Sequence, residues 1–381
     1  MNVNRLLPDG TRHEEELINK SQLYVTTAGW KNTFAYDKNM TLLVQSIIEP
    51  EQAIVLGGTW RVPVMEELLS KNFVQELKLD GTFNEASFDR EYESKWGGDA
   101  ENAYFNSDTF DKHRVLNQPE YERTGRLGRN GYYVFGIDVG RTDCTTEVCV
   151  IKVLPQPQGS FLKSIVNFYS WEAEHFGLQS INIKKLYYKF LPREIGIDAN
   201  GNGVGLVDFL TTDQVDPDTG DLLPNFGVGD GTFDGWKQQY KDRKTKDTVN
   251  DILFLIKANA PINTECHAYV NTQLSSGKIK LLIDEGVAKS KLLDTKRGQE
   301  MSAEKRAEYL KPFVLTSVLK EQMANLIQDN DGVNIILKQA ERKIPKDRFS
   351  AFEYGLYTVK RHEDKRKRNG TRDISKLMFF G

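Results

Sequence analysis

The chain has 381 residues, of which 39% are hydrophobic and 28% charged, and its formal net charge is −3. This length and composition predict a globular protein of two domains, and the overall charge does not by itself indicate a polyanionic partner. No run of about 18 apolar residues occurs, so the sequence predicts no membrane-spanning segment.

The cysteines and histidines make a zinc or disulfide framework unexpected. Cys144, Cys149 and Cys266 form no CxxC pair, and the five histidines form no HExxH pattern. The first twenty residues lack the apolar core of a secretory signal. These features together predict reduced thiols in a cytosolic protein.

Residues 1–127 differ in pattern from the rest of the chain. The segment QLYVTTAGW (22–30) predicts a strand followed by a turn of small residues, and a polar helix is expected around Val64–Leu77. The stretch 88–105 mixes aromatic and charged residues without a clear period. This part does not resemble a complete domain, and the basic, glycine-rich segment 123–131 is the expected linker.

The pattern becomes regular from Tyr132 onward. Three apolar segments with tight connections, 132–138, 146–154 and 161–172, predict an antiparallel meander. A helical pattern over 179–191 then leads directly into the strand REIGID (193–198). A strand, a helix and a strand in this order predict a parallel crossover.

The remainder of the chain predicts mainly helices. They are expected at 202–212, 245–258, 264–274, 302–328 and 346–361, with one strand at 332–340 and a polar hairpin or mobile loop at 213–231. The last helix carries a buried stripe made of Phe349, Phe352, Leu356 and Val359. The predicted fold class is therefore α/β, a mixed sheet flanked by helices.

Two of the predicted strands end in the same tripeptide, Gly-Ile-Asp, which places Asp138 and Asp198 at strand ends. Ionised carboxylates there are costly and repel each other unless a cation compensates them, although a single such Asp is also a common turn or helix cap. Mg²⁺ and Mn²⁺ prefer oxygen ligands, and we therefore predict that both residues bind metal. For a third acid, periodicity does not choose between Asp143, Asp347 and Glu353, the last of which is expected off the buried stripe.

With these motifs in place, the chain resembles the large terminase subunit of tailed bacteriophages. YYVFGIDVGRTDCT, REIGIDANGNGVGLVDFL and IPKDRFSAFEYGLY resemble, in this order, the three acidic motifs of its nuclease domain. The resemblance implies a ribonuclease H-like fold over residues 128–381 and two Mg²⁺ or Mn²⁺ ions. Their implied ligands are Asp138, Asp198 and Asp347, with phosphodiester hydrolysis that cuts concatemeric double-stranded DNA.

The same resemblance implies that residues 1–127 are the C-terminal part of a packaging P-loop ATPase domain. No GxxxxGK[ST] motif is present, so ATP hydrolysis by this chain alone is not expected, and the chain is expected to be a fragment, a split gene product or a prophage remnant. The family implies a portal protein, a small terminase subunit and the procapsid as partners. It also implies action in the cytoplasm of the infected bacterial host.

Basic residues supply the expected contacts to the DNA backbone, without reading of bases. They are Arg141, Lys241, Arg243, Lys244, Lys246, Lys365, Arg366, Lys367 and Arg368, each of which is otherwise an ordinary solvated charge. The polar stretch 213–231 is a candidate flap over the site.

Three other functions are compatible with parts of the sequence. An ATP-binding protein of the actin, Hsp70 and sugar-kinase group would use GIDVGRT and DANGNG as phosphate loops, but the three strands do not recur in a second half. Another ribonuclease H-like nuclease, a resolvase or transposase, would leave residues 1–127 without a role. A structural portal-docking module would need carboxylates that bind no metal.

Overall fold

The computed structural model describes residues 9, 22–28, 34–79, 88, 91–96, 103–125, 127, 130–140, 145–157, 160–172, 174–331 and 334–377. The chain divides into two compact units, Met1–Gly98 and Asp99–Gly381. This division falls earlier than the boundary at residue 127 expected from the sequence. Phe105 and Phe110, which precede that boundary, are buried in the core of the second unit.

The first unit has three helices among its described residues, α1 (Phe34–Ile48), α2 (Arg61–Met65) and α3 (Phe73–Leu79). The helix expected over 64–77 is therefore broken in two, and the strand expected within the segment 22–30 does not form in its described residues, 22–28. The Trp60 ring lies 6.5 Å from the rings of both Phe73 and Phe88, so a small aromatic cluster organises this unit.

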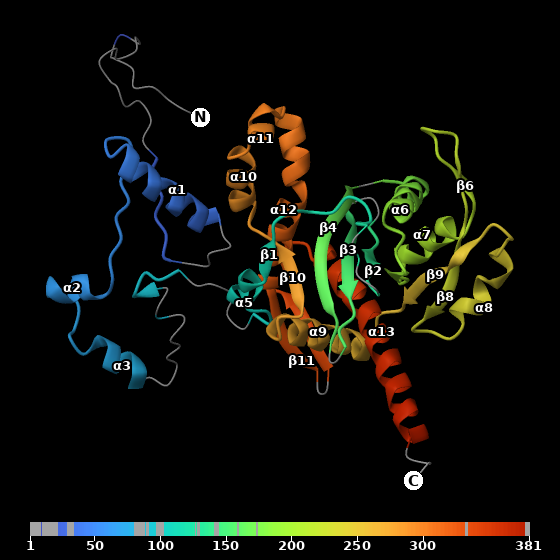
Figure 1. The fold of residues 1–381 in the computed structure, drawn as a ribbon. Helices are drawn as coiled ribbons and strands as arrows, with labels where there is room; N and C mark the ends of the chain where they lie inside the picture. Colours follow the sequence, from blue (N-terminus) through green and yellow to red (C-terminus); the bar gives the residue numbers. More distant parts are fainter. Residues whose placement is uncertain are drawn as a thin grey trace. The chain divides into compact units, whose positions relative to one another are not determined.

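An eight-stranded sheet forms the centre of the second unit (Figure 1). Its order is β1-β10-β4-β3-β2-β5-β9-β8. The middle strands β4, β3 and β2 are antiparallel, whereas β5, β9 and β8 continue parallel to β2. This confirms the predicted mixed α/β sheet. The strands are β1 (Arg114–Leu116), β2 (Tyr132–Asp138), β3 (Thr145–Leu154), β4 (Leu162–Glu172), β5 (Glu194–Asp198), β8 (Phe226–Gly231), β9 (Val249–Ile256) and β10 (Ile279–Leu282).

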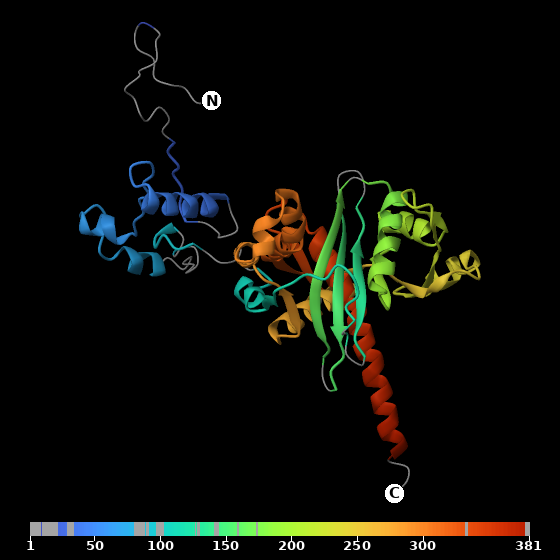
Figure 2. The same cartoon turned by 45° about the horizontal axis from the view of Figure 1, so that its top comes forward.

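Helices cover both faces of this sheet, and Figure 2 shows the central strands side by side with helices around them. One hydrophobic cluster joins the sheet to α6 (Phe176–Phe190), α7 (Asn202–Leu210) and α8 (Trp236–Gln239). A second joins it to α9 (Ala260–Ser275), α12 (Ala303–Ala324) and α13 (Asp347–Leu377). The predicted stripe of α13 is confirmed, because Phe349, Phe352, Leu356 and Val359 all belong to this second cluster.

Smaller elements complete the unit. They are α5 (Ser107–Lys112), the 3-10 turn η1 (Lys241–Arg243), α10 (Glu285–Leu293), α11 (Lys296–Glu300), and the hairpins β6–β7 (Gln214–Val215, Leu222–Leu223) and β11–β12 (Leu326–Asp331, Asn334–Gln339). In the part of the chain that the structure describes, no helix is both long and apolar enough to cross a membrane.

Two predicted elements after residue 212 are wrong or only partly right. The expected helix 245–258 is the strand β9, because its run ILFLI is buried on both faces and such a run has no period that separates strand from helix. The stretch 213–231 forms the small β6–β7 hairpin and then the edge strand β8. The predicted strand 332–340 does form, as β12, but in a separate two-stranded sheet.

The repeated glycine of Gly-Ile-Asp allows α13 to lie directly on the sheet. Gly136 and Gly196 are paired side by side in the parallel register of β2 and β5. A Cβ atom on Gly136 would overlap the backbone of Ala351 and Gly355, and one on Gly196 would overlap the Thr358 hydroxyl. Glycine at both positions is therefore a packing requirement, and it determines how close the helix lies to the two strands.

Candidate active site

Three carboxylates lie on the same face and edge of the sheet. Asp138 and Asp198 are the last residues of β2 and β5, whose register pairs Ile137 with Ile197. Side chains alternate along a strand, so each aspartate shares a face with the glycine two residues before it, which is the face covered by α13. The two Gly-Ile-Asp motifs thus bring two acids to one place.

The third carboxylate comes from the start of α13. This helix runs antiparallel to β2 and β5, because Ala351 lies against Gly136 whereas His362 contacts Glu194 at the beginning of β5. Its first residue, Asp347, therefore lies over the edge where the two strands end. A helix N-terminus carries partial positive charge, which favours ionised carboxylates nearby.

The three acids interact electrostatically. Burial raises the pKa of Asp138 well above its usual value, and the charges of Asp347 and Asp198 raise it further. Burial also raises the pKa of Asp198 and of Asp347. Lys346 opposes all three shifts, because its positive charge favours the ionised carboxylates. A site with one lysine and three such acids remains short of positive charge.

Backbone donors hold two of the acids in place. The Asn200 N–H donates to the Asp198 carboxylate over 2.9 Å, so Asp198 also caps the turn that follows its strand. The backbone N–H of Thr145, the first residue of β3, donates to Asp347. Each bond uses one carboxylate lone pair and leaves further oxygen sites for a cation.

A buried ion pair borders the site. Glu147 on β3 is directly opposite Asp138 in the antiparallel register. Its carboxylate accepts from Arg348 Nη2 at 2.6 Å and from the Ser170 hydroxyl at 2.8 Å. Burial raises the pKa of Glu147, and the adjacent Arg348 charge opposes this shift. The pair ties the first turn of α13 to β3, next to Asp347.

Glu353 lies in a different environment from the three aspartates. It is buried, contrary to the expectation that it lies off the buried stripe, and it forms a short hydrogen bond with His267 of α9. Burial raises its pKa, while His267 favours its ionised form. Its partner on α9 accounts for its position in the core. Asp143 and Arg141 lie outside the described residues.

In their present positions, no three Asp, Glu, His or Cys side chains of the described residues surround a common point suited to one ion. The donor set itself suits a hard divalent cation, because it consists of carboxylate oxygens whose charged forms are disfavoured without one.

The structure separates the predicted DNA-contacting cations from the carboxylates. Lys241, Arg243, Lys244 and Lys246 precede β9, whose opposite end pairs with Asp198. Arg243 forms an ion pair of 2.9 Å with Asp208, and Lys244 pairs with Asp251. The cations Lys365, Arg366, Lys367 and Arg368 are exposed in the second half of α13.

Sequence reasoning missed two charged residues at the carboxylate edge, Lys346 and Lys257. Both are exposed; Lys346 precedes Asp347, and Lys257 follows Ile256, which pairs with Asp198. Glu147 was also missed, because β3 shows no repeat of the Gly-Ile-Asp motif. The position of Lys346 directly before the third acid was the available signal for that residue.

No protein-family model and no curated protein sequence matches the chain. Solved structures of phage large terminases and of their nuclease domains are among those to which it is similar. The magnesium-bound nuclease of thermophilic phage G20c has 11% identity and a TM-score of 0.36, over 68% of this chain and 98% of that one.

Two further similar structures extend this set. The large terminase of bacteriophage HK97 has 8% identity and a TM-score of 0.33, over 76% of this chain and 50% of that one. The P22 large terminase nuclease domain has 11% identity and a TM-score of 0.31, over 65% and 91%. The G20c nuclease is also known with bound cobalt and with bound zinc.

Proposed function

We propose that the second unit is a nuclease that hydrolyses DNA phosphodiester bonds with divalent metal ions held by Asp138, Asp198 and Asp347. The observation that carries the proposal is the position of Asp138, a partly buried carboxylate whose pKa is raised by burial and by the charges of the other two aspartates. A bound cation relieves this repulsion, and carboxylate oxygens are the ligands that Mg²⁺ and Mn²⁺ prefer.

The three aspartates share one role in this proposal. Asp138, on which the charges of Asp347 and Asp198 both act, would hold the divalent ions together with those two residues. Such ions would lower the pKa of an attacking water and stabilise the leaving 3′-oxygen. Asn200 and the Thr145 backbone orient Asp198 and Asp347, and the Glu147–Arg348 pair positions the first turn of α13.

The DNA backbone would be held near the carboxylates by Lys346 and Lys257. Both are exposed on the edge where β5 and β9 end, whereas the cations at 241–246 lie at the opposite end of β9. Phosphate contacts of this kind position a duplex without reading its sequence. Affinity for DNA should therefore decrease as salt concentration rises.

Supercoiled plasmid provides the direct test. The purified chain with Mn²⁺ or Mg²⁺ should nick or linearise the plasmid, and EDTA should abolish the activity. Asp138→Asn, Asp198→Asn and Asp347→Asn should each reduce cleavage by about 100-fold or more, because each removes a charged metal ligand. Retained cleavage in all three variants would contradict the proposal.

Asp294→Asn is the matched control for these variants. Asp294 is exposed and follows α10, and its replacement by Asn makes the same change in charge and volume as the three test substitutions. Its cleavage rate should remain within about twofold of the unmodified chain, in line with the small effects of most surface substitutions. Quenching of the protein's fluorescence by Mn²⁺, or a calorimetric titration with Mn²⁺, measures metal binding by the same variants. Either measurement separates loss of metal binding from loss of DNA binding.

The wider setting that we propose is the phage DNA-packaging terminase, which would cut concatemeric double-stranded DNA in the cytoplasm of an infected bacterium. This proposal depends on the order and spacing of the three acidic motifs in the sequence. The portal protein, the small terminase subunit and the procapsid are the corresponding proposed partners. The assignment of the first unit to a packaging ATPase is likewise a proposal, and the sequence contains no GxxxxGK[ST] motif for ATP hydrolysis.

A further inference from the structure

A second concave site lies at the opposite end of the sheet from the carboxylates. It is a cavity of about 1060 Å³ whose lining includes Tyr132, Phe161, Arg193, Glu194, Lys365 and Arg366. Tyr132 begins the strand that Asp138 ends, and six residues of extended strand span about 20 Å. This cavity is therefore separate from the proposed nuclease site.

The cavity has an excess of positive charge. Its lining contains three basic residues that are charged at neutral pH, Arg193, Lys365 and Arg366, and a single acid, Glu194. No carboxylate of the described residues forms an ion pair with any of these three cations. The charge of Lys365 does act on Glu194, but the lining as a whole keeps an excess of positive charge, which favours an anionic ligand.

The single acid is already engaged. Glu194 Oε2 accepts from His362 Nε2 at 2.8 Å and from Arg361 Nη1 at 3.1 Å. Burial opposes its ionisation, but the hydrogen bond from His362 and the charge of Arg361 together lower its pKa. Glu194 is therefore committed to the residues beside the cavity and does not neutralise Arg193 or Arg366.

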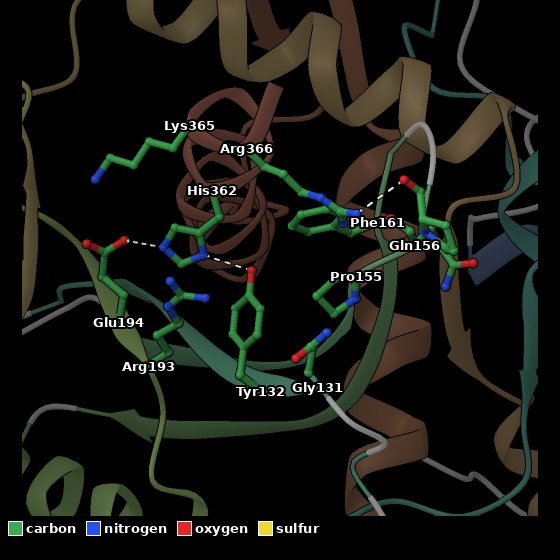
Figure 3. Close-up of a pocket in the computed structure, with 12 residues that line it drawn as sticks. Gly131, Tyr132, Pro155, Gln156, Phe161, Arg193, Glu194, His362, Lys365 and Arg366 are labelled. Carbon is green, nitrogen blue, oxygen red and sulfur yellow. Dashed lines mark hydrogen bonds and ion pairs between the residues drawn. The ribbon is translucent and has the colours of Figure 1, made fainter. Parts of the chain in front are cut away.

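The walls of the cavity are held in place before any ligand binds. His362 bridges Glu194 and the Tyr132 hydroxyl, which lies 2.9 Å from His362 Nδ1, as Figure 3 shows. The Arg193 guanidinium lies 5.0 Å from the centre of the Tyr132 ring. A ligand would not have to order these groups, which reduces the entropic cost of binding.

Arg366 is fixed in a similar way from the other wall. Its guanidinium donates to the backbone carbonyls of Gln156 (2.6 Å) and Pro157 (3.2 Å), and it lies 5.4 Å from the centre of the Phe161 ring. A guanidinium has five N–H donors, so three remain for a ligand. Planar groups of this type match the oxygens of phosphate.

We propose that this cavity binds the phosphate group of a phosphorylated ligand, with Arg193, Lys365 and Arg366 as its charged contacts. Three cations and one acid give a net lining charge of +2, which suits the charge of a phosphoryl dianion. The phosphate can belong to a free phosphorylated compound or to a nucleic acid, and the two sources present the same chemistry to the site.

Two probes distinguish the sources, both measured on the full chain in EDTA so that no metal ion contributes. Inorganic pyrophosphate is titrated in a calorimeter, and a 20-base-pair DNA duplex with a fluorescent label is followed by anisotropy. Arg193→Gln and Lys365→Gln should each weaken binding of at least one probe about tenfold, the effect expected for loss of one charged hydrogen bond. Saturable pyrophosphate binding identifies a free phosphorylated compound, and binding of the duplex alone identifies nucleic acid.

Lys296→Gln is the control, because Lys296 is exposed at the start of α11 and does not line the cavity. It should change affinity less than twofold. If Lys296→Gln weakens binding as much as Lys365→Gln, or if neither probe binds, the proposal is wrong. Circular dichroism and thermal melting confirm folding, and the exposed Lys365 provides a variant with little risk to the core.

Asp138→Asn separates this proposal from the nuclease proposal. It should bind pyrophosphate like the unmodified chain, whether or not the unmodified chain cleaves plasmid, because Asp138 lies at the opposite end of β2 from the cavity. If the unmodified chain binds pyrophosphate or the duplex but does not cleave plasmid, only the nuclease assignment is contradicted. If it cleaves plasmid but binds neither probe in EDTA, only the phosphate site is contradicted.

Discussion

Asp138 illustrates the conflict between stability and function at the level of one residue. Folding places its carboxylate beside Asp198 and Asp347 in a partly buried position, and its pKa is raised as a result. A group with a raised pKa in the folded state makes the protein less stable once the pH exceeds the pKa of the unfolded chain, about 4 for Asp. Without metal, the folded protein therefore loses stability as pH rises toward the higher folded pKa.

Asp138→Asn should accordingly stabilise the metal-free protein at neutral pH. The variant should melt about 2–4 °C higher than the unmodified chain at pH 8 in EDTA, corresponding to roughly 1 kcal/mol, and the difference should vanish near pH 4. Added Mg²⁺ or Mn²⁺ should reverse the order, because only the unmodified chain gains a charged ligand. An equal or lower melting temperature for the variant at pH 8 would show that the ionised Asp138 carboxylate does not destabilise the folded protein.

The Glu147–Arg348 pair makes a second prediction at the residue level. Both side chains are buried, so Arg348→Met leaves the Glu147 carboxylate without its partner and should destabilise the second unit by about 3–5 kcal/mol. Adding Glu147→Gln to Arg348→Met should recover part of this loss in urea unfolding. If the double variant loses as much free energy of unfolding as the two single variants together, Glu147 and Arg348 are not energetically coupled.

At the level of elements, contact between α13 and the sheet depends on Gly136. Gly136→Ala would place a methyl group against the backbone of Ala351 and Gly355, which cannot move away as a flexible side chain can. We expect a loss of about 1–3 kcal/mol or more in urea unfolding, together with reduced plasmid cleavage because Asp347 moves with the helix.

Gly125→Ala is the control for the effect of an added methyl group. A Cβ atom on Gly125 would meet no heavy atom within 4 Å. Its free energy of unfolding should remain within about 0.5 kcal/mol of the unmodified chain. Equal effects at the two glycines would mean that the close approach of α13 is unimportant.

The sequence predicts most of the sheet and the neighbouring strand ends at Asp138 and Asp198, but periodicity did not choose the third acid, and the whole architecture was not predicted. The motifs ending at Asp138 and Asp198 were sufficient to predict that these two carboxylates lie close together, because a parallel crossover places two such strand ends side by side. β9 was missed because burial on both faces removes the alternation that marks a strand. Glu147 was missed because its role depends on pairing with β2 and α13, which no local pattern reveals.

At the level of the whole molecule, the two units differ in how much core they contain. Among the described residues, Phe88 is the only buried hydrophobic residue of the first unit, whereas all others lie at or beyond Phe105. Leu23, Val25, Ile54 and Leu56 of the first unit are each at least 74% exposed. Apolar exposure of this extent favours association with other surfaces.

Residues 99–381 should therefore fold without the first unit. We expect this fragment to unfold in one cooperative transition and to retain the plasmid cleavage proposed for the full chain. Differential scanning calorimetry and the plasmid assay measure both properties. Loss of the cooperative transition on removal of residues 1–98 would show that the core depends on the first unit.

Helix α13 runs from the carboxylate edge of the second unit to the cavity at its other end. Asp347 begins it and Arg366 lies nineteen residues later, which corresponds to about 28 Å of helix. Gly136 and Gly196 lie against the first half of this helix. The distance between the carboxylates and the cavity is therefore set by the length of one helix, and a displacement of α13 relative to the sheet would move residues of both sites together.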